Sequence, residues 1–162
     1  MKIKKTNKQY SEIQLSELKQ QLNIDADYTA EDTFLTSLIE ASVEYCENLA
    51  GFDIVSTDNE LLVKDFNSNS INVYEANFSA ITSITLNSET INDYEVEEFY
   101  SKFKIEFTDS MSGDLLINFQ TSDLKARYKQ AILIKASNLY DVERQSYTSL
   151  SHNDNVLKYL LL

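Results

Sequence analysis

Proline is absent from this chain of 162 residues, and glycine occurs at only two positions. Average usage is about 5% for proline and about 7% for glycine. Lysine far exceeds arginine and asparagine is common, so we attribute the composition to a low-GC coding bias rather than to a structural need. Turns must therefore be predicted from asparagine, aspartate and serine, because proline and glycine do not mark them.

Cysteine and long apolar runs are also scarce. The single cysteine, Cys46, excludes an internal disulfide and a zinc site built from cysteines. No apolar run approaches the roughly 18 residues that a membrane-spanning helix needs, so we expect no membrane partner. The basic N-terminus has no apolar segment behind it, and we therefore expect no signal peptide and synthesis in the cytoplasm.

Positive charge is the next deficit, because the net charge is −12. Residues 20–63 contain no lysine or arginine but ten acidic residues. Such a chain does not bind nucleic acid through phosphate contacts. The acidic residues form a solvated face, a surface for a basic partner, or a surface that repels DNA, and the sequence leaves these three open.

Catalytic and cofactor motifs are missing as well. The chain has no HExxH, GxSxG, GxGxxG or GxxxxGK[ST] sequence, so we predict neither an enzyme nor a cofactor. Asp25, Asp27 and Thr29 resemble the start of a calcium loop, but Ala30 and Thr36 stand where the loop needs glycine and glutamate. We expect Cys46 to be a buried, unreactive thiol, because the only histidine, His152, is distant in sequence.

Three helices are predicted from apolar spacing. A short one covers 16–22, a long one covers about 30–50, and a late one covers about 123–144. For the long helix we expect Thr29 as N-cap with Asp32 at the third helical position, and Gly51 as the terminating residue. Ser122 is the predicted cap of the late helix.

The middle of the chain predicts a β-rich insert at about 52–120, built mainly of short antiparallel meanders. The predicted strands are 54–56, 61–66, 71–74, 81–87, 94–96, 103–107 and 115–119. Turns are expected at 57–60, 87–90 and 109–113. The fold class is therefore α+β, with a small helical bundle around a central antiparallel β insert.

Domain organisation follows from the same pattern. We expect a basic N-terminal arm at 1–12, one domain at 13–148 and a C-terminal tail at 149–162. The arm is either a solvated tail or a contact to an acidic surface. The apolar tail residues are too hydrophobic to remain exposed, so they pack on their own domain or on a neighbouring copy: Val156, Leu157, Tyr159, Leu160, Leu161 and Leu162.

The helical segments resemble the head–tail connector family of long-tailed phages, the adaptors that complete the phage head. The first segment matches the family's short helix, its I-D-x-D turn and its long helix, and ITSITLN stands where the family has a V-x-S-I-x-x-V strand. The late segment matches the family's L-x-x-A-I-L-x-x-A-x-x-L-Y-x-x-R-E helix, although Gln145 replaces the last glutamate and the preceding proline is missing. The matching residues are Leu15, Lys19, Leu22, Ile24, Asp25, Asp27, Asp32, Leu35, Leu38, Ile39, Ala41, Tyr45, Glu47, Gly51, Leu124, Ala131, Ile132, Leu133, Ala136, Leu139, Tyr140 and Arg144.

The resemblance implies a non-enzymatic structural protein of the virion neck, made in the host cytoplasm. Copies would form a ring of roughly twelve-fold symmetry below the portal, extend the DNA channel and receive a stopper or tail-completion protein. Double-stranded DNA would pass through without specific binding. The expected contacts to neighbouring copies or to the portal are Tyr140, Arg144, Val156, Leu157, Tyr159, Leu160 and Leu161.

A second hypothesis is an acidic protein that mimics DNA and binds a basic cleft of an enzyme, or another soluble protein-binding module. Glu40, Glu44 and Glu47 are spaced to form an acidic surface on the long helix. Binding to a portal would distinguish the connector from such an inhibitor.

Overall fold

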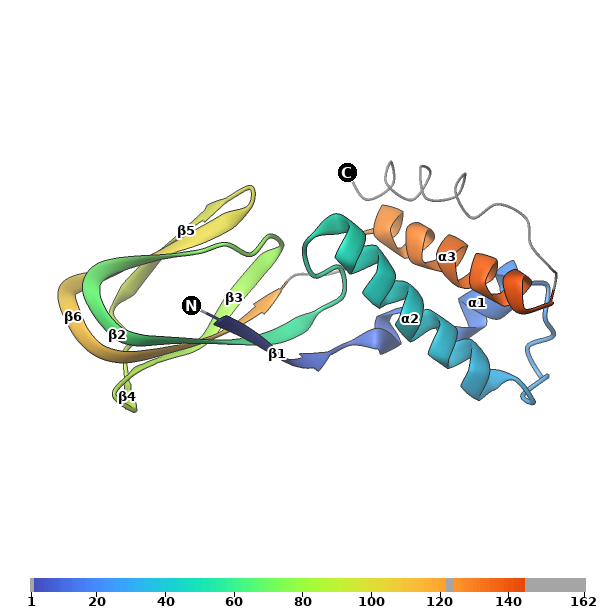
Figure 1. The fold of residues 1–162 in the computed structure, drawn as a ribbon, viewed down its shortest axis with the longest axis horizontal. Helices are drawn as coiled ribbons and strands as arrows, with labels where there is room; N and C mark the ends of the chain where they lie inside the picture. Colours follow the sequence, from blue (N-terminus) through green and yellow to red (C-terminus); the bar gives the residue numbers. More distant parts are fainter. Residues whose placement is uncertain (1, 122–123, 145–162) are drawn as a thin grey trace. The chain divides into compact units, whose positions relative to one another are not determined.

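The structure is a computed structural model that describes residues 2–121 and 124–144. The chain divides into two compact units (Figure 1). In the described range, residues 10–54 and 124–144 form a helical unit, and residues 2–9 and 55–121 form a β unit. The predicted α+β class, with helices and an antiparallel sheet, is confirmed.

The helical unit contains a short 3-10 turn and three α-helices. The elements are η1 (Tyr10–Glu12), α1 (Leu15–Gln21), α2 (Asp32–Ala50) and α3 (Ala126–Arg144). All three helices lie close to their predicted bounds. Helix α2 ends as expected, because Gly51 adopts a left-handed conformation with φ of 81° and donates its N–H to the Glu47 carbonyl.

The predicted N-cap of α2 is wrong. The helix begins at Asp32 with Glu31 as N-cap, and the Glu31 side chain makes no capping hydrogen bond. Thr29 therefore does not cap the helix, and its carbonyl accepts the Asp32 N–H at 3.2 Å. Asp32 is instead held by Lys19 from α1. The predicted cap of α3, Ser122, lies outside the described residues.

The core of the helical unit is formed by one face of α2 packed on α3. Its side chains recur at the spacing of an amphipathic helix, which explains why the helices were predictable. A Phe34–Tyr140 ring pair at 6.3 Å and a Phe52–Tyr128 pair at 5.8 Å join α3 to α2 and to the residues after it. The buried side chains include Leu18, Leu35, Ile39, Val43, Cys46, Ala131, Ile132 and Ala136.

The β unit is one antiparallel sheet of six strands, β1 (Lys2–Lys8), β2 (Thr57–Val73), β3 (Phe78–Leu86), β4 (Glu89–Thr90), β5 (Tyr94–Phe99) and β6 (Lys102–Thr121). Their order is β1-β2-β6-β3-β4, and β5 pairs with the first part of β6, at residues 102–107. The long strands β2 and β6 form the centre of the sheet, so the predicted meander order is wrong although the antiparallel pairing is confirmed.

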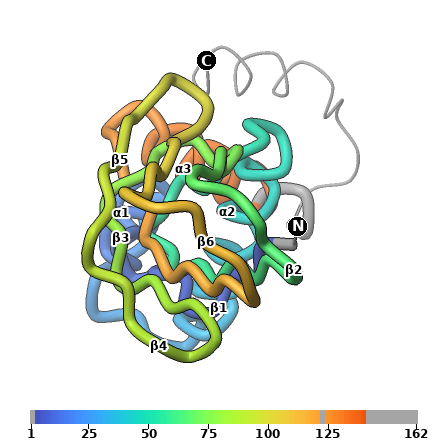
Figure 2. Tube along the Cα trace, turned by 90° about the vertical axis from the view of Figure 1, so that its left-hand side faces the viewer, coloured from blue at the N-terminus to red at the C-terminus, as the bar shows by residue number. Residues whose placement is uncertain are grey.

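Strand β6 bends back upon itself. Phe103 and Phe119 are sixteen residues apart, and a straight strand would separate them by about 50 Å. Their ring centroids are nevertheless 5.1 Å apart. Register shifts between Val63 and Phe66 and between Ser68 and Ser70 of β2 bend the central pair. The sheet therefore rolls around its own apolar core, as seen end-on in Figure 2.

Polar contacts around Gly113 join β6 to the neighbouring segments at the bend. Gly113 has a φ of +144°, and the side chain of Asn87 lies where a Cβ of residue 113 would stand. The Asp114 N–H donates to Asn87 Oδ1, and the Asn87 N–H donates to the Asp114 carbonyl, each at 2.9 Å. The Asp114 carboxylate accepts hydrogen bonds from Lys64 Nζ at 2.6 Å and from the Asp65 N–H at 3.3 Å.

Two predicted turns are in fact strand. Residues 57–60 belong to β2, and residues 109–113 belong to β6. Thr57 and Asn59 are buried polar residues that take part in hydrogen bonds. The Thr57 N–H donates to Thr121 Oγ1 of β6, and Asn59 Nδ2 donates to the Thr57 carbonyl. Polar residues in a buried row hide the alternation from which a strand is predicted.

The N-terminal residues also differ from expectation. Lys2–Lys8, expected as part of a basic arm, form β1 and pair with residues 57–62 of β2. Of these residues Ile3 alone is apolar, so no alternation of apolar and polar residues indicated a strand.

Candidate functional site

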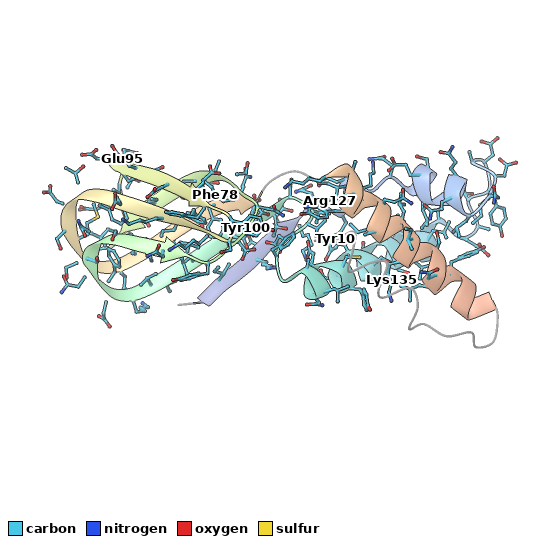
Figure 3. All side chains as sticks on the ribbon, turned by 90° about the horizontal axis from the view of Figure 1, so that it is seen from above. Tyr10, Phe78, Glu95, Tyr100, Arg127 and Lys135 are labelled. Atoms are coloured by element: carbon cyan, nitrogen blue, oxygen red, sulfur yellow. The ribbon has the colours of Figure 1, made fainter. Side chains whose placement is uncertain are left out.

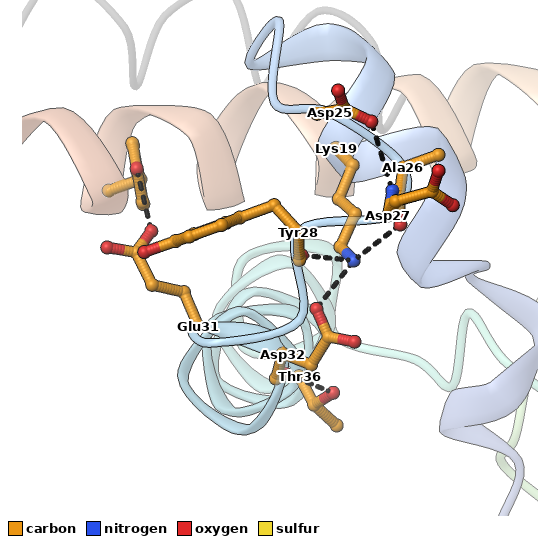
Figure 4. A network of polar contacts seen from close by, with 9 residues as sticks. Lys19, Asp25, Ala26, Asp27, Tyr28, Glu31, Asp32 and Thr36 are labelled. Carbon is orange, nitrogen blue, oxygen red and sulfur yellow. Dashed lines mark hydrogen bonds and ion pairs between the residues drawn. The ribbon is translucent and has the colours of Figure 1, made fainter.

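Lys19 joins three elements of the helical unit. Its ammonium group forms an ion pair with Asp32 Oδ1 at 2.6 Å and donates to the carbonyls of Tyr28 at 2.8 Å and Ala26 at 3.3 Å (Figure 4). Lys19 is only 5% exposed. A buried ammonium group is stable when a carboxylate and carbonyl oxygens surround it, so Lys19 holds α1, the following turn and the start of α2 in one arrangement.

The aspartate-rich turn has a structural role in this arrangement. Asp25 Oδ1 accepts the Asp27 N–H at 3.1 Å, which is an Asx turn. Among the residues that the structure describes, no three histidine, cysteine, aspartate or glutamate side chains are grouped as metal ligands. In the turn that resembles a calcium loop in sequence, the carbonyls of Ala26 and Tyr28 accept hydrogen bonds from Lys19.

Tyr140 is buried within its own unit. Its ring packs on Phe34, and its hydroxyl donates to Glu31 Oε2 at 3.0 Å, so it ties α3 to the start of α2. Arg144 is the last residue of α3. The other predicted contact residues, Val156, Leu157, Tyr159, Leu160 and Leu161, lie outside the described residues, as does the whole tail at 149–162.

The three glutamates predicted as an acidic surface separate into two groups. Glu40 and Glu44 are exposed on α2, and Glu44 Oε1 accepts the Tyr10 hydroxyl at 2.6 Å. Glu47 is 6% exposed, and its Oε1 accepts the buried Ile54 N–H at 2.9 Å. Glu47 is therefore not part of an exposed acidic surface, because its carboxylate binds a backbone N–H in the segment that follows α2.

Cys46 and Lys135 meet in the core of the helical unit. Burial raises the pKa of the Cys46 thiol to about 12, against a smaller opposite effect of the Lys135 charge. A thiol with this pKa is protonated at neutral pH and is a poor nucleophile, as expected from its position. Lys135, labelled in Figure 3, places its ammonium group 3.5 Å from the centroid of the Tyr45 ring.

An exposed aromatic patch in the β unit was not predicted. Tyr74 is 68% exposed, Phe99 45% and Tyr100 94%. Lys102 Nζ lies 5.7 Å from the Tyr74 ring centroid and 5.0 Å from that of Phe99. The adjacent aromatics Phe99 and Tyr100, placed just before the β6 strand, are the only signal in the sequence that favoured such a patch.

The described helices contain no stretch that is long and apolar enough to cross a membrane. The buried charges of Lys19 and Glu47 are paired with groups of the helical unit itself. What the geometry offers to a partner is surface: exposed carboxylates, exposed aromatics and the edges of a sheet.

Residues 12–106 match the model of the phage gp6-like head–tail connector protein family. The match covers more than half of the chain and includes α1, α2 and most of the β unit. The chain belongs to this family. As a head–tail connector it is a structural protein of the virion neck, and the family resemblance predicted from the helical segments is confirmed.

Chains of a gene transfer agent particle share the connector's fold. A chain from the neck of the empty particle, computed with C6 symmetry, has a TM-score of 0.79 and 16% identity and covers 99% of this chain and 95% of its own. A chain from the native virion has a TM-score of 0.77, 16% identity and coverage of 98% and 94%. A chain from the native neck, computed with C12 symmetry, has a TM-score of 0.74, 15% identity and coverage of 99% and 94%. No curated protein sequence matches the chain.

Proposed function

We propose that copies of this connector form a closed ring between the portal and the tail, and that the ring extends the channel through which DNA passes. The observation that carries the proposal is the family match over residues 12–106. The similar chains come from particle necks treated with C6 and C12 symmetry, which supports an arrangement with rotational order. Copies related by rotation use heterologous contacts, and these close into a ring when the rotation permits.

The charge of the chain suits such a channel. With a net charge of −12, the connector as a whole repels phosphate groups. DNA then slides through the ring without being held, because few lysines and arginines are available to replace its counterions. The exposed carboxylates Glu40 and Glu44 add to this repulsion on α2.

The partners of the proposed ring are the portal above it and a stopper or tail-completion protein below it. The apolar tail residues Val156, Leu157 and Tyr159 to Leu161 remain our candidates for the portal or neighbour contact. Tyr140 is not among the direct contact residues that we propose, because its side chain is buried in the helical unit and hydrogen-bonded to Glu31. The alternative of a DNA mimic is not favoured, since Glu47 is buried and does not extend the exposed pair Glu40 and Glu44 into a longer acidic row.

Binding to the portal tests the proposal. The purified connector is mixed with the portal ring of the same virus, and the mass of the complex is measured by mass photometry. We expect a species heavier than the portal by a whole ring of connector copies. The variant L157S/L160S/L161S should weaken this binding, whereas the control S151A/N153A, in the polar first part of the tail, should not. Absence of any complex with the portal contradicts the proposal.

A further inference from the structure

The β unit carries opposite charges on two of its strands. Strand β1, KIKKTNK, has four lysines and no acidic residue. Strand β5, YEVEEF, has three glutamates and no basic residue. Asp93 adds a further acidic residue directly before β5. Both strands belong to a chain whose net charge is strongly negative, so the lysines of β1 are a local departure from the overall composition.

These two strands lie at opposite edges of the sheet. Strand β1 lies beyond β2, and β5 lies beyond β6, while β2 and β6 pair with each other in the centre. Within the described residues, each of the two strands pairs with the sheet on one side only. Figure 2 shows them on different sides of the rolled sheet. Each edge therefore presents backbone N–H and carbonyl groups on its outer side.

The charged side chains on both edges are accessible to solvent. Lys4 and Lys5 are exposed on β1, and the Lys4 ammonium lies 3.9 Å from Glu60 of the neighbouring strand, a weak surface pair. Glu95, Glu97 and Glu98 are exposed on β5. Figure 3 shows Glu95 at the rim of the sheet. Exposed positive charge therefore lies on β1 at Lys4 and Lys5, and exposed negative charge lies on β5.

Charge decides which edges of two copies can approach each other. Two β1 edges would bring lysines together, and two β5 edges would bring glutamates together, and like charges on adjacent strands are destabilising. The β3 edge has no charged residue in FSAITSITL and offers β1 no attraction of this kind. A β1 edge beside a β5 edge is the pairing in which opposite charges meet.

We propose that the β1 edge of one copy docks along the β5 edge of the next copy. The contact joins two different surfaces of the same chain, so it is heterologous and repeats around a ring. The inference rests on the proposed ring and identifies its subunit interface. Charge on the edges then has two effects: it blocks pairing between equal edges and sets a single direction around the ring.

Charge reversal with mutual rescue tests the interface. The variant K4E/K5E places two glutamates on the β1 edge, and E95K/E98K places two lysines on the β5 edge, so in each variant like charges face each other at the substituted positions. Glu97 is left unchanged because it lies opposite Lys104 on β6. Each variant alone should weaken self-association by about tenfold or more, as attractive pairs become repulsive. An equimolar mixture should assemble again, because each reversed edge meets its complement on the other variant.

Further variants separate this result from an effect of total charge. The chain K4E/K5E/E95K/E98K has the wild-type net charge and should assemble by itself. The matched control E89K, which reverses a charge on β4, should assemble like the wild type. Sedimentation velocity gives the association, and circular dichroism verifies that each variant is folded.

A cysteine pair provides an independent measurement that needs no charge reversal. Since Cys46 is buried, cysteines introduced as K5C and E95C are the reactive ones. Oxidation of mixed K5C and E95C chains should give K5C–E95C dimers in large excess over K5C–K5C and E95C–E95C dimers.

The two proposals fail in different ways. If the wild type assembles on its portal but both charge-reversed variants assemble equally well, or the mixture shows no rescue, the interface is contradicted while the ring remains. Equal amounts of all three disulfide dimers contradict it as well. If the wild type remains monomeric at high concentration and does not bind the portal, the proposed ring is contradicted. The proposed interface is then contradicted as well.

Discussion

In the helical unit the charged residues Lys19 and Glu47 are almost fully buried and bind backbone atoms, whereas in the β unit the lysines of β1 and the glutamates of β5 lie on exposed edges. Buried charges of the first kind fix the position of chain segments, because leaving them unpaired would be costly. Exposed charges of the second kind contribute little to stability but govern which surfaces approach each other. We therefore expect substitutions of charge to affect folding in one unit and assembly in the other.

The aromatic core of the β unit should show the largest effect. Phe103 is fully buried between the rings of Phe78 and Phe119, at 4.1 and 5.1 Å. F103A should lower the free energy of unfolding by about 3–5 kcal/mol, through lost burial and the cavity left behind. Hydrogen exchange measured by mass spectrometry should show lost protection in residues 57–121, with the helical unit largely unchanged. Equal loss in both units would show that the two cores are not separate.

Lys19 should show the next largest effect, now in the helical unit. K19M leaves Asp32 and the carbonyl of Tyr28 without their cation and should lower the free energy of unfolding by about 2–3 kcal/mol. Chemical denaturation measures this difference. The control K4M removes an exposed lysine with a 3.9 Å contact and should cost less than about 0.5 kcal/mol. Similar losses for both variants would contradict a special role for the buried lysine.

Glu47 and Glu40 offer a finer comparison on one helix. E47A removes the acceptor of the buried Ile54 N–H and should cost about 1–2 kcal/mol in the free energy of unfolding. E40A, at an exposed position, should remain within about 0.5 kcal/mol of the wild type. If E40A proved the more destabilising of the two, our assignment of Glu47 to the interior would be wrong.

Asp114 should have the smallest effect, and one that depends on pH. The hydrogen bond from Lys64, and then that from the Asp65 N–H, hold the pKa of the Asp114 carboxyl below its ordinary value of 3.8. A folded-state pKa below the unfolded one stabilises the fold above pH 3.8, and this contribution disappears as pH falls through the folded pKa. The difference in unfolding free energy between wild type and D114N should therefore shrink from about pH 6 to about pH 3, as urea denaturation would measure. A difference that grows on acidification would contradict the sign.

The two units also differ in how far their structure follows from the sequence. Helices α2 and α3 have apolar residues at helical spacing, so their existence and approximate length were predictable. The starting cap of α2 was not, because Asp32 is used by Lys19, a contact between residues thirteen positions apart in the chain. The family motif already contained Lys19 and Asp32, but it gave no reason for them.

In the β unit, strand existence was largely predictable but strand length and order were not. Thr57 and Asn59 interrupt the apolar pattern of β2 because they are buried through hydrogen bonds, and the bend near Gly113 divides the pattern of β6. The edge strand β1 has one apolar residue, Ile3, and was missed entirely. Hydrogen bonds and long-range pairing, rather than local propensity, decide these elements.

Electron cryomicroscopy of the virion neck can show directly whether the connector forms a ring. We predict a closed ring of this connector between the portal and the tail, with the acidic β5 edge of each copy facing the basic β1 edge of its neighbour. A neck in which no copy of the chain occupies that position would contradict the proposed function.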